Sequence, residues 1–147
     1  MSTHAPTLYV AEPPTAYLYR PPMVVDCSVI VAALFEEETR AQAYEMMVGK
    51  TLCAPYLLDV EFVSVALKKS RLGWPAPSVK QALADYAVQN IELYDTDIPS
   101  QYALALRYNL SAYDAAYLWL AAELKTTLAT FDKKLALAAK THFASLP

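Results

Sequence analysis

The stretch of residues 109–135 constrains the fold more than any other, because it joins a thoroughly apolar helix to a short strand. Ser111 followed by Asp114 is a helix start signal: the serine caps the first turn, and the aspartate meets the positive end of the helix dipole. From Ala115 to Leu124 the residues are apolar on nearly every side. That pattern predicts a helix buried in the interior, not one lying on the surface.

A β-rich run over residues 127–131 follows this helix and ends at Asp132. One carboxylate, that of Asp114, therefore opens a buried helix, and a second closes the strand after it. In open α/β sheets, ligands gather at the carboxyl ends of the strands and the neighbouring loops. From this stretch alone, a cap at Asp114 and a turn at Asp132 explain the two residues equally well.

The remaining chain alternates short apolar runs with longer helical segments. Strands are predicted at residues 23–25, 51–54, 91–94 and 127–131, and helices at 29–35, 36–49, 55–70, 78–88, 99–108, 111–124 and 133–140. Ser28 and Ser78 are expected to cap helices, Glu36, Glu37 and Glu38 to open one, and Pro55 to occupy a first turn. Such alternation predicts an α/β fold with three layers, in which helices cover both faces of a short, mostly parallel sheet.

Residues 1–22 differ from the rest, since they hold five of the ten prolines of the chain together with Tyr9, Tyr17 and Tyr19. They contain no unbroken apolar run of signal-peptide length, which excludes an export signal. We interpret them as an extended or polyproline-like arm that either docks on a domain or is a passive tail. The domain itself is expected to span residues 23–147.

The composition narrows the chemistry to carboxylates. Two glycines leave no glycine-rich phosphate loop, and two histidines are too few for a histidine zinc site or an obvious Ser-His-Asp triad. Cys27 and Cys53 form no C-x-x-C pair and are expected to be reduced core residues. A net charge of −3 means that nucleic-acid binding needs local patches or metal ions. No transmembrane-length run is present.

The predicted helix over residues 55–70 holds two carboxylates, Asp59 and Glu61. Glu61 falls on an otherwise mostly apolar stripe, where a carboxylate must pair, protonate or bind a cation, whereas Asp59 can face water in the first turn. We therefore favour Glu61 as the functional residue. Asp95 and Asp97 follow the third strand and are predicted to form a turn and a cap.

Four carboxylates thus stand at privileged positions, namely Asp26, Glu61, Asp114 and Asp132. Two carboxylates about 4 Å apart repel by roughly 4 kcal/mol at an effective dielectric constant near 20. The interaction of one carboxylate with the positive end of a helix stabilises by only about 0.3–1 kcal/mol. If the four converge, protons or a metal ion must offset the repulsion. Oxygen ligands without histidine or cysteine suit Mg²⁺ or Mn²⁺.

Four segments, taken in order, resemble the PIN-domain ribonucleases and in particular the VapC-type toxins: VVDCSVIVAALF, APYLLDVEFVSVALKK, LSAYDAAYLWLAAEL and LATFDKKLA. The resemblance covers about residues 23–140. It implies a PIN-like α/β/α fold, metal-dependent cleavage of RNA, homodimerisation, and neutralisation by a cognate antitoxin. A cytoplasmic location is expected. The proline- and tyrosine-rich arm departs from the family pattern.

Carried over by position, the resemblance implies that Asp26, Glu61, Asp114 and Asp132 form the catalytic and metal-binding quartet, and that Ser28 and Thr130 are supporting hydroxyls. Metal chemistry then predicts that one or two Mg²⁺ or Mn²⁺ ions bind the scissile phosphate and activate water. The basic residues expected to steer RNA phosphates are Lys68, Lys69, Arg71, Lys133 and Lys134, although an ordinary solvated surface explains each one equally well.

Two alternatives compete with the nuclease. A non-catalytic PIN-like module would bind RNA or a protein without cutting, but clustered negative charge facing phosphate would not help a pure binding surface. A receiver-like phospho-acceptor at Asp26 would need an acidic pair at the first strand and a lysine ending the last strand. Neither is cleanly present, because residues 24–26 read Val-Val-Asp and the last strand ends in Phe131 and Asp132.

Overall fold

The structure is a computed structural model that describes residues 6–11, 19–35 and 37–147. Its centre is a sheet of four parallel strands in the order β3-β2-β1-β4. The strands are β1 (Pro22–Val25), β2 (Thr51–Pro55), β3 (Glu92–Tyr94) and β4 (Thr127–Ala129). The predicted parallel sheet is confirmed, and every strand pair in it is parallel.

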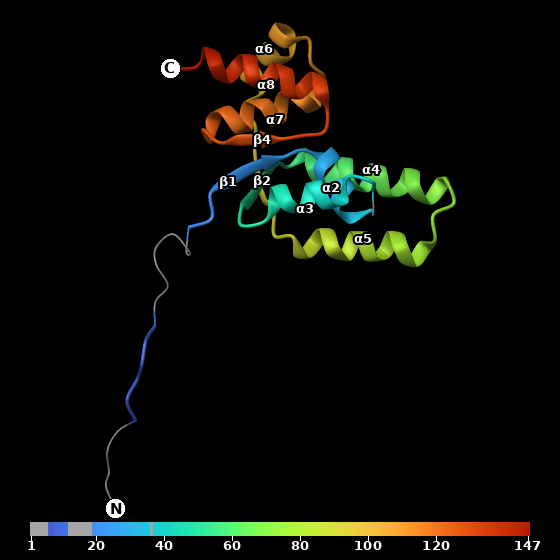
Figure 1. The fold of residues 1–147 in the computed structure, drawn as a ribbon. Helices are drawn as coiled ribbons and strands as arrows, with labels where there is room; N and C mark the ends of the chain where they lie inside the picture. The colour runs from blue at the N-terminus through green and yellow to red at the C-terminus, as the bar shows by residue number, and fades with distance from the viewer. Residues whose placement is uncertain (1–5, 12–18, 36) are drawn as a thin grey trace, which may run out of the picture.

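Helices cover both faces of this sheet, which confirms the three-layer α/β/α prediction. They are α2 (Cys27–Leu34), α3 (Arg40–Met47), α4 (Leu57–Arg71), α5 (Ala76–Val88), α6 (Ile98–Tyr108), α7 (Ala112–Glu123) and α8 (Lys133–Ser145). In Figure 1, α6, α7 and α8 lie on one side of β1 and β2, and α2, α3, α4 and α5 lie on the other. None of the described helices is both long and apolar enough to cross a membrane.

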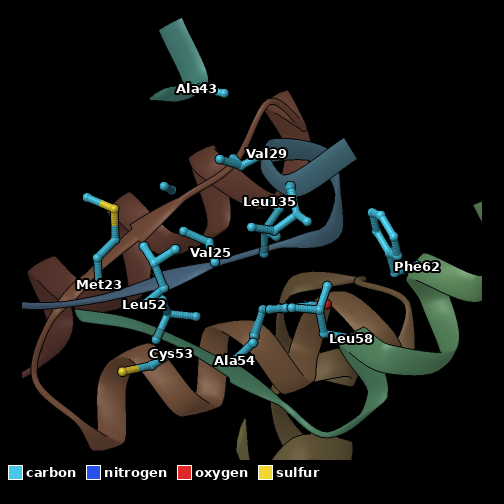
Figure 2. Close-up of a cluster of buried hydrophobic side chains, with 14 of the residues drawn as sticks. Met23, Val25, Val29, Ala43, Leu52, Cys53, Ala54, Leu58, Phe62 and Leu135 are labelled. Atoms are coloured by element: carbon cyan, nitrogen blue, oxygen red, sulfur yellow. The ribbon is translucent and has the colours of Figure 1, made fainter. Parts of the chain in front are cut away.

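Helix α7 is the buried helix that its apolar sequence predicted. Its residues 115–118, together with Leu120 and Ala121, are buried, and the helix contacts β1, β2 and β4. Side chains of β1 and β2 meet Leu58 and Phe62 of α4 in the same core (Figure 2). The helices on both faces of the sheet therefore contribute apolar side chains. The central strands are covered on both sides, as is usual for a parallel sheet.

The register of β1 against β4 determines which residues meet at the carboxyl end of the sheet. Val25 pairs with Ala129, so the residues that follow, Asp26 and Thr130, leave the sheet side by side. The backbone N–H of Asp26 donates to the carbonyl of Ala129 at 3.2 Å and extends the ladder by one bond. Two segments far apart in sequence therefore deliver their polar side chains to one place.

Two predicted caps are wrong. Asp26, not Ser28, is the N-cap of α2, and its carboxylate accepts a hydrogen bond from the backbone N–H of Val29. Helix α5 begins after Pro75, whose carbonyl accepts the N–H of Ser78, so Ser78 lies inside the first turn and does not cap the helix. In both places a residue upstream already has the extended backbone of an N-cap, and the helix starts there.

Two further boundaries also differ from expectation. Pro55 is the last residue of β2, where it pairs with Tyr94, and does not lie in the first turn of α4. Helix α3 begins only at Arg40, so Glu37 and Glu38 precede it, and Glu36 lies outside the described residues. The first of these differences arises because strand pairing extends the backbone past the point where the local sequence allows a helix.

Other local predictions are confirmed. Ser111 caps α7 and accepts a hydrogen bond from the N–H of Asp114 at 3.1 Å. Asp97 caps α6 and accepts from the N–H of Ser100 at 3.1 Å, as its position after the third strand indicated. Cys27 and Cys53 are free thiols; Cys53 is buried in the core, whereas Cys27 is half-buried and packs against it.

The described part of the arm consists of residues 6–11 and 19–21, because residues 1–5 and 12–18, which include Tyr17, lie outside the described residues. Leu8, Tyr9 and Val10 are 85%, 86% and 71% exposed, and Tyr19 is 67% exposed. Figure 1 shows residues 6–11 extending away from the helices and strands. The arm ends where Pro22 begins β1, one residue before the predicted start of the domain.

Candidate active site

Asp26 is the most deeply buried carboxylate of the four, with 5% of its surface exposed at the end of β1. Its Oδ1 accepts hydrogen bonds from the Ser28 hydroxyl at 2.6 Å and from the N–H of Val29 at 3.3 Å. Its Oδ2 accepts a hydrogen bond from the Thr130 hydroxyl. Burial raises the pKa of Asp26, and these donors oppose the rise by stabilising the charged form.

The two hydroxyls predicted as supporting groups connect the loops after β1 and β4. Ser28 Oγ accepts from the N–H of Phe131 at 2.9 Å while it donates to Asp26. Thr130 Oγ1 accepts from the N–H of Asp132 at 2.9 Å while it donates to the other oxygen of the same carboxylate. This network turns the chain away from the sheet, and it explains why β4 ends at Ala129, two residues before the predicted end.

Glu61 points from α4 toward α7, where its Oε1 accepts a hydrogen bond from the Tyr117 hydroxyl at 2.7 Å. Tyr117 is 1% exposed and lies one helical turn after Asp114. Burial raises the pKa of Glu61, the bond from Tyr117 opposes that rise, and the charges of Asp26 and Asp114 add to it. Tyr117 is a site residue that the sequence reasoning missed, because it looked like one more apolar member of a buried helix.

Asp59 takes the other side of the same helix. Its Oδ1 accepts a hydrogen bond from the hydroxyl of Tyr86 on α5, and the residue is exposed. Asp59 and Glu61 thus each bind a tyrosine, but on opposite faces of α4 and toward different helices. The prediction that Glu61 faces the buried side and Asp59 the solvent agrees with these contacts.

Asp114 and Asp132 occupy the first turn of α7 and the N-cap of α8. Asp132 Oδ1 accepts a hydrogen bond from the backbone N–H of Leu135 at 2.9 Å. Burial raises the pKa of Asp114, with further increases from the charges of Asp132 and Asp26, whereas Lys134 lowers it. Both carboxylates therefore sit at the positive ends of helices, and the charge of one acts on the other.

The four predicted carboxylates come together electrostatically. The negative charge of Asp26 raises the pKa values of Glu61 and Asp114, and Asp132 raises those of Asp26 and Asp114. Cys27, next to Asp26, has its pKa raised to about 12 by burial and by the charges of Glu61 and Asp26. Such a thiol is neutral at physiological pH and is a poor nucleophile.

The basic residues predicted to steer RNA differ in whether their side chains are already paired or are exposed to solvent. Lys69 donates to Glu37 at 2.7 Å and lies 4.5 Å from the ring centroid of Trp74, so its charge is already engaged. Lys68 and Arg71 are exposed in the last turn of α4. Lys133 and Lys134 are exposed in the first turn of α8, directly after Asp132. The last two lie closest in sequence to the carboxylates.

The donor set of this region consists of carboxylate and hydroxyl oxygens, which are the ligands that Mg²⁺ and Mn²⁺ prefer. Within the described ranges, no group of three or more His, Cys, Asp or Glu side chains stands close enough to hold a metal ion. The mutual repulsion of Asp26, Glu61 and Asp114 nevertheless makes a cation favourable there. The residues fit such an ion in chemistry and sign, and ligation requires their side chains to draw closer together.

Comparison with known proteins shows which family and which fold the chain resembles. Residues 23–141 match the PIN domain family. The chain is 33% identical over 116 residues to the curated proteins named Ribonuclease VapC9 of Mycobacterium tuberculosis and VapC ribonuclease Mb0985 of Mycobacterium bovis, across 77% of this chain and 87% of each relative. The crystal structure of PAE2754 from Pyrobaculum aerophilum matches with a TM-score of 0.62 and 21% identity, over 84% of this chain and 93% of that chain. This last likeness concerns the fold.

Proposed function

The chain belongs to the PIN-domain family and within it to the VapC-type ribonucleases, and from this premise we propose that it is a metal-dependent endoribonuclease, the toxin of a toxin–antitoxin pair. One observation carries the proposal. Four carboxylates from four separate segments act on one another's charge at the carboxyl end of a parallel sheet. A non-catalytic binding module gains nothing from such a cluster, because it would repel RNA phosphates.

Asp26 and Asp114 are the first choices for direct metal ligands, with Asp132 and Glu61 completing the set. Bound there, Mg²⁺ or Mn²⁺ would supply Lewis acidity toward a phosphate and toward water. We assign to the chain itself the task of holding four carboxylates in place against their repulsion. Ser28 and Thr130 do so through hydrogen bonds to Asp26.

Tyr117 does the same for Glu61 from within the core. Because the tyrosine is almost fully buried, its hydroxyl has one well-defined position, and Glu61 Oε1 is held there. The charges of Asp26 and Asp114 act on the carboxylate held in this way. Lys133 and Lys134, beside Asp132, are the best-placed residues for the approaching phosphates.

We infer that the partners are RNA, a cognate antitoxin and a second copy of the chain, in the cytoplasm. An apolar cavity of about 570 Å³ next to Glu61 supports a protein partner at this face. It is lined by Cys27, Leu57, Val60 and Tyr113 among others, and Val60 and Tyr113 are 72% and 60% exposed. Apolar side chains that remain so exposed beside a polar site are typical of a protein interface.

The test is cleavage of total RNA with Mg²⁺ or Mn²⁺, with EDTA as the control, followed by mapping of the ends. Hydrolysis by water would leave 5′-phosphate and 3′-hydroxyl ends, whereas attack by a 2′-hydroxyl would leave cyclic phosphates. Melting curves provide a second readout: either ion should raise the melting temperature of the wild type and do little for the Asp26→Asn, Asp114→Asn double variant. Cleavage that persists in EDTA, or equal stabilisation of both proteins, would contradict the proposal.

A further inference from the structure

At the end of the sheet opposite the carboxylates lies a groove of about 560 Å³, called here the amino-end groove. Its apolar lining includes Leu128 of β4 and Ala139 and Phe143 of α8. Three lysines, Lys50, Lys125 and Lys140, stand around it and form no ion pair with any described carboxylate. No acidic residue of the described chain lines the groove.

The groove runs beside an open strand edge. β4 is the last strand in the order β3-β2-β1-β4, so β1 is its one strand neighbour in the described part of the chain. Thr127 and Leu128 of this edge strand both line the groove. A sheet edge with an apolar shelf next to it is a ready position for an extended segment.

The arm carries a segment of that kind. Leu8, Tyr9 and Val10 form an apolar, β-prone run, and all three side chains are more than two-thirds exposed. The arm also leaves the domain at the groove itself, since Pro21 and Pro22 line it. We propose that residues 8–10 of the arm occupy the amino-end groove of a second copy of the chain, so that two copies exchange arms.

Charge complements this apolar contact. Glu12 follows the apolar run by two residues, and the groove presents three lysines and no described carboxylate. This glutamate therefore carries a charge of the sign opposite to that of the groove. A surface ion pair contributes only about 0.2–1 kcal/mol, so charge would affect the direction of binding more than its affinity.

The connection between the apolar run and β1 gives the arm reach beyond its own domain. Eleven residues, 11–21, separate Val10 from Pro22 at the base of β1, and eleven extended residues span at most about 36–40 Å. Two of them are the consecutive prolines Pro13 and Pro14, and a proline-rich connection favours an extended path over a compact reversal. Residues 6–11 extend away from the helices and strands of their own domain (Figure 1), and none of them lines the amino-end groove.

Mutual exchange closes the assembly, because each copy gives one arm and receives one, as a two-fold dimer requires. This inference goes beyond the proposed nuclease function, since it concerns assembly at the end of the sheet away from the carboxylates. Its tests use no cleavage readout, so the failure of one does not imply the failure of the other.

The direct test is disulfide cross-linking between two chains. One preparation carries Leu8→Cys and the other Ala136→Cys, an exposed position in the groove; the two are mixed and oxidised. We expect a covalent dimer between the two different variants. The matched control is Leu137→Cys, which is 57% exposed on the same helix but does not line the groove and should form far less of the dimer. Wild-type protein controls for the native Cys27 and Cys53.

A chain that carries both Leu8→Cys and Ala136→Cys separates exchange from docking within one copy. An internal disulfide at monomer mass in dilute solution, with no covalent dimer in the mixture, would overturn the proposal in favour of self-docking. Cross-linking equal to that of the Leu137→Cys control would overturn it in favour of a passive tail. As a second measurement, the triple variant Leu8→Ser, Tyr9→Ser, Val10→Ser should weaken the dimer at least tenfold by light scattering, and an unchanged dimer would contradict the exchange.

Discussion

The two ends of the parallel sheet carry opposite charge and are organised in opposite ways. At the carboxyl end, Asp26 is buried and accepts three hydrogen bonds, and Glu61 accepts one from Tyr117. At the amino end, the lysines around the groove form no ion pair with a described carboxylate. One end is therefore an acidic site held together by internal donors, and the other is a basic surface without such support.

This difference between the two ends shows which charges reduce the stability of the folded state. Burial and mutual repulsion raise the pKa values of Asp26, Glu61 and Asp114, so at neutral pH their ionised forms destabilise the folded state. Lysines in solvent carry no comparable cost. Charges that are costly to bury yet supported by donors are typical of a site built for chemistry, whereas solvated charges beside an apolar groove are typical of recognition.

The largest expected effect contrasts two carboxylates of α4. Glu61→Gln should reduce RNA cleavage by more than about 100-fold, because it removes one of the clustered carboxylate charges. Loss of a group that only orients a carboxylate costs less, about 10–100-fold. Asp59→Asn should stay close to wild type, since Asp59 binds Tyr86 on the opposite face of the helix. Initial rates on a defined RNA, with far-UV circular dichroism to confirm folding, measure both. The reverse result would assign the site to the wrong face of α4.

Removing the tyrosine hydroxyl that supports Glu61 should have the next largest effect. Tyr117→Phe should weaken Mn²⁺ binding and cleavage by about 10–100-fold, the usual cost of losing a group that orients a ligand. Tyr86→Phe is the matched control, because it also removes a hydroxyl that donates to a carboxylate of α4, in this case Asp59. Titration of Mn²⁺ by electron paramagnetic resonance separates binding from stability. Equal losses in both variants would mean that the loss does not depend on the hydrogen bond to Glu61.

Lysines at the two ends should contribute differently to RNA binding. The double variant Lys133→Ala, Lys134→Ala should raise KM several-fold. It should also reduce the slope of the logarithm of RNA affinity against the logarithm of salt concentration by about one for each lost contact between a lysine and a phosphate. Lys125→Ala with Lys140→Ala removes the same charge at the amino end and should leave both quantities unchanged. Measuring KM for both double variants across a range of salt concentrations tests this difference. If both pairs shift KM equally, RNA is attracted by general charge and not by the acidic end of the sheet.

The smallest effect concerns stability without metal. The folded-state pKa of Asp114 lies above its unfolded value, so the stability linked to its proton is present at low pH and is lost as the pH rises through the folded pKa. Asp114→Asn should therefore raise the melting temperature at pH 7 by about 2 °C, a small value because solvent screens a partly exposed group. The gain should shrink as the pH falls through the folded pKa and vanish once the pH lies below the unfolded pKa, and it should also shrink in saturating Mg²⁺. A lower melting temperature at pH 7 would show that the carboxylate stabilises its helix more than its neighbours repel it.

Much of this arrangement could be predicted from local patterns. The apolar run after Ser111 predicted the buried helix α7, and the alternation of runs predicted the parallel sheet. Each carboxylate of the proposed quartet was recognised by its place at the end of a strand or the start of a helix, or on an apolar stripe. The helix starts at Ser28, Ser78 and Pro55 were predicted wrongly, because capping preferences are weak beside strand pairing and the backbone of the preceding residues.

The sequence by itself determined the order of the elements and the residue types that can do chemistry, since hydrophobic periodicity and carboxylate positions are local properties. The tertiary structure decided which groups support the carboxylates. Tyr117 and Glu61 lie 56 residues apart, and Thr130 and Asp26 lie 104 apart. Neither pair has a local signature, because a hydroxyl on a buried helix or after a strand has many potential acceptors. Only the packing of α7 against α4, and the register of β4 beside β1, selects one acceptor for each.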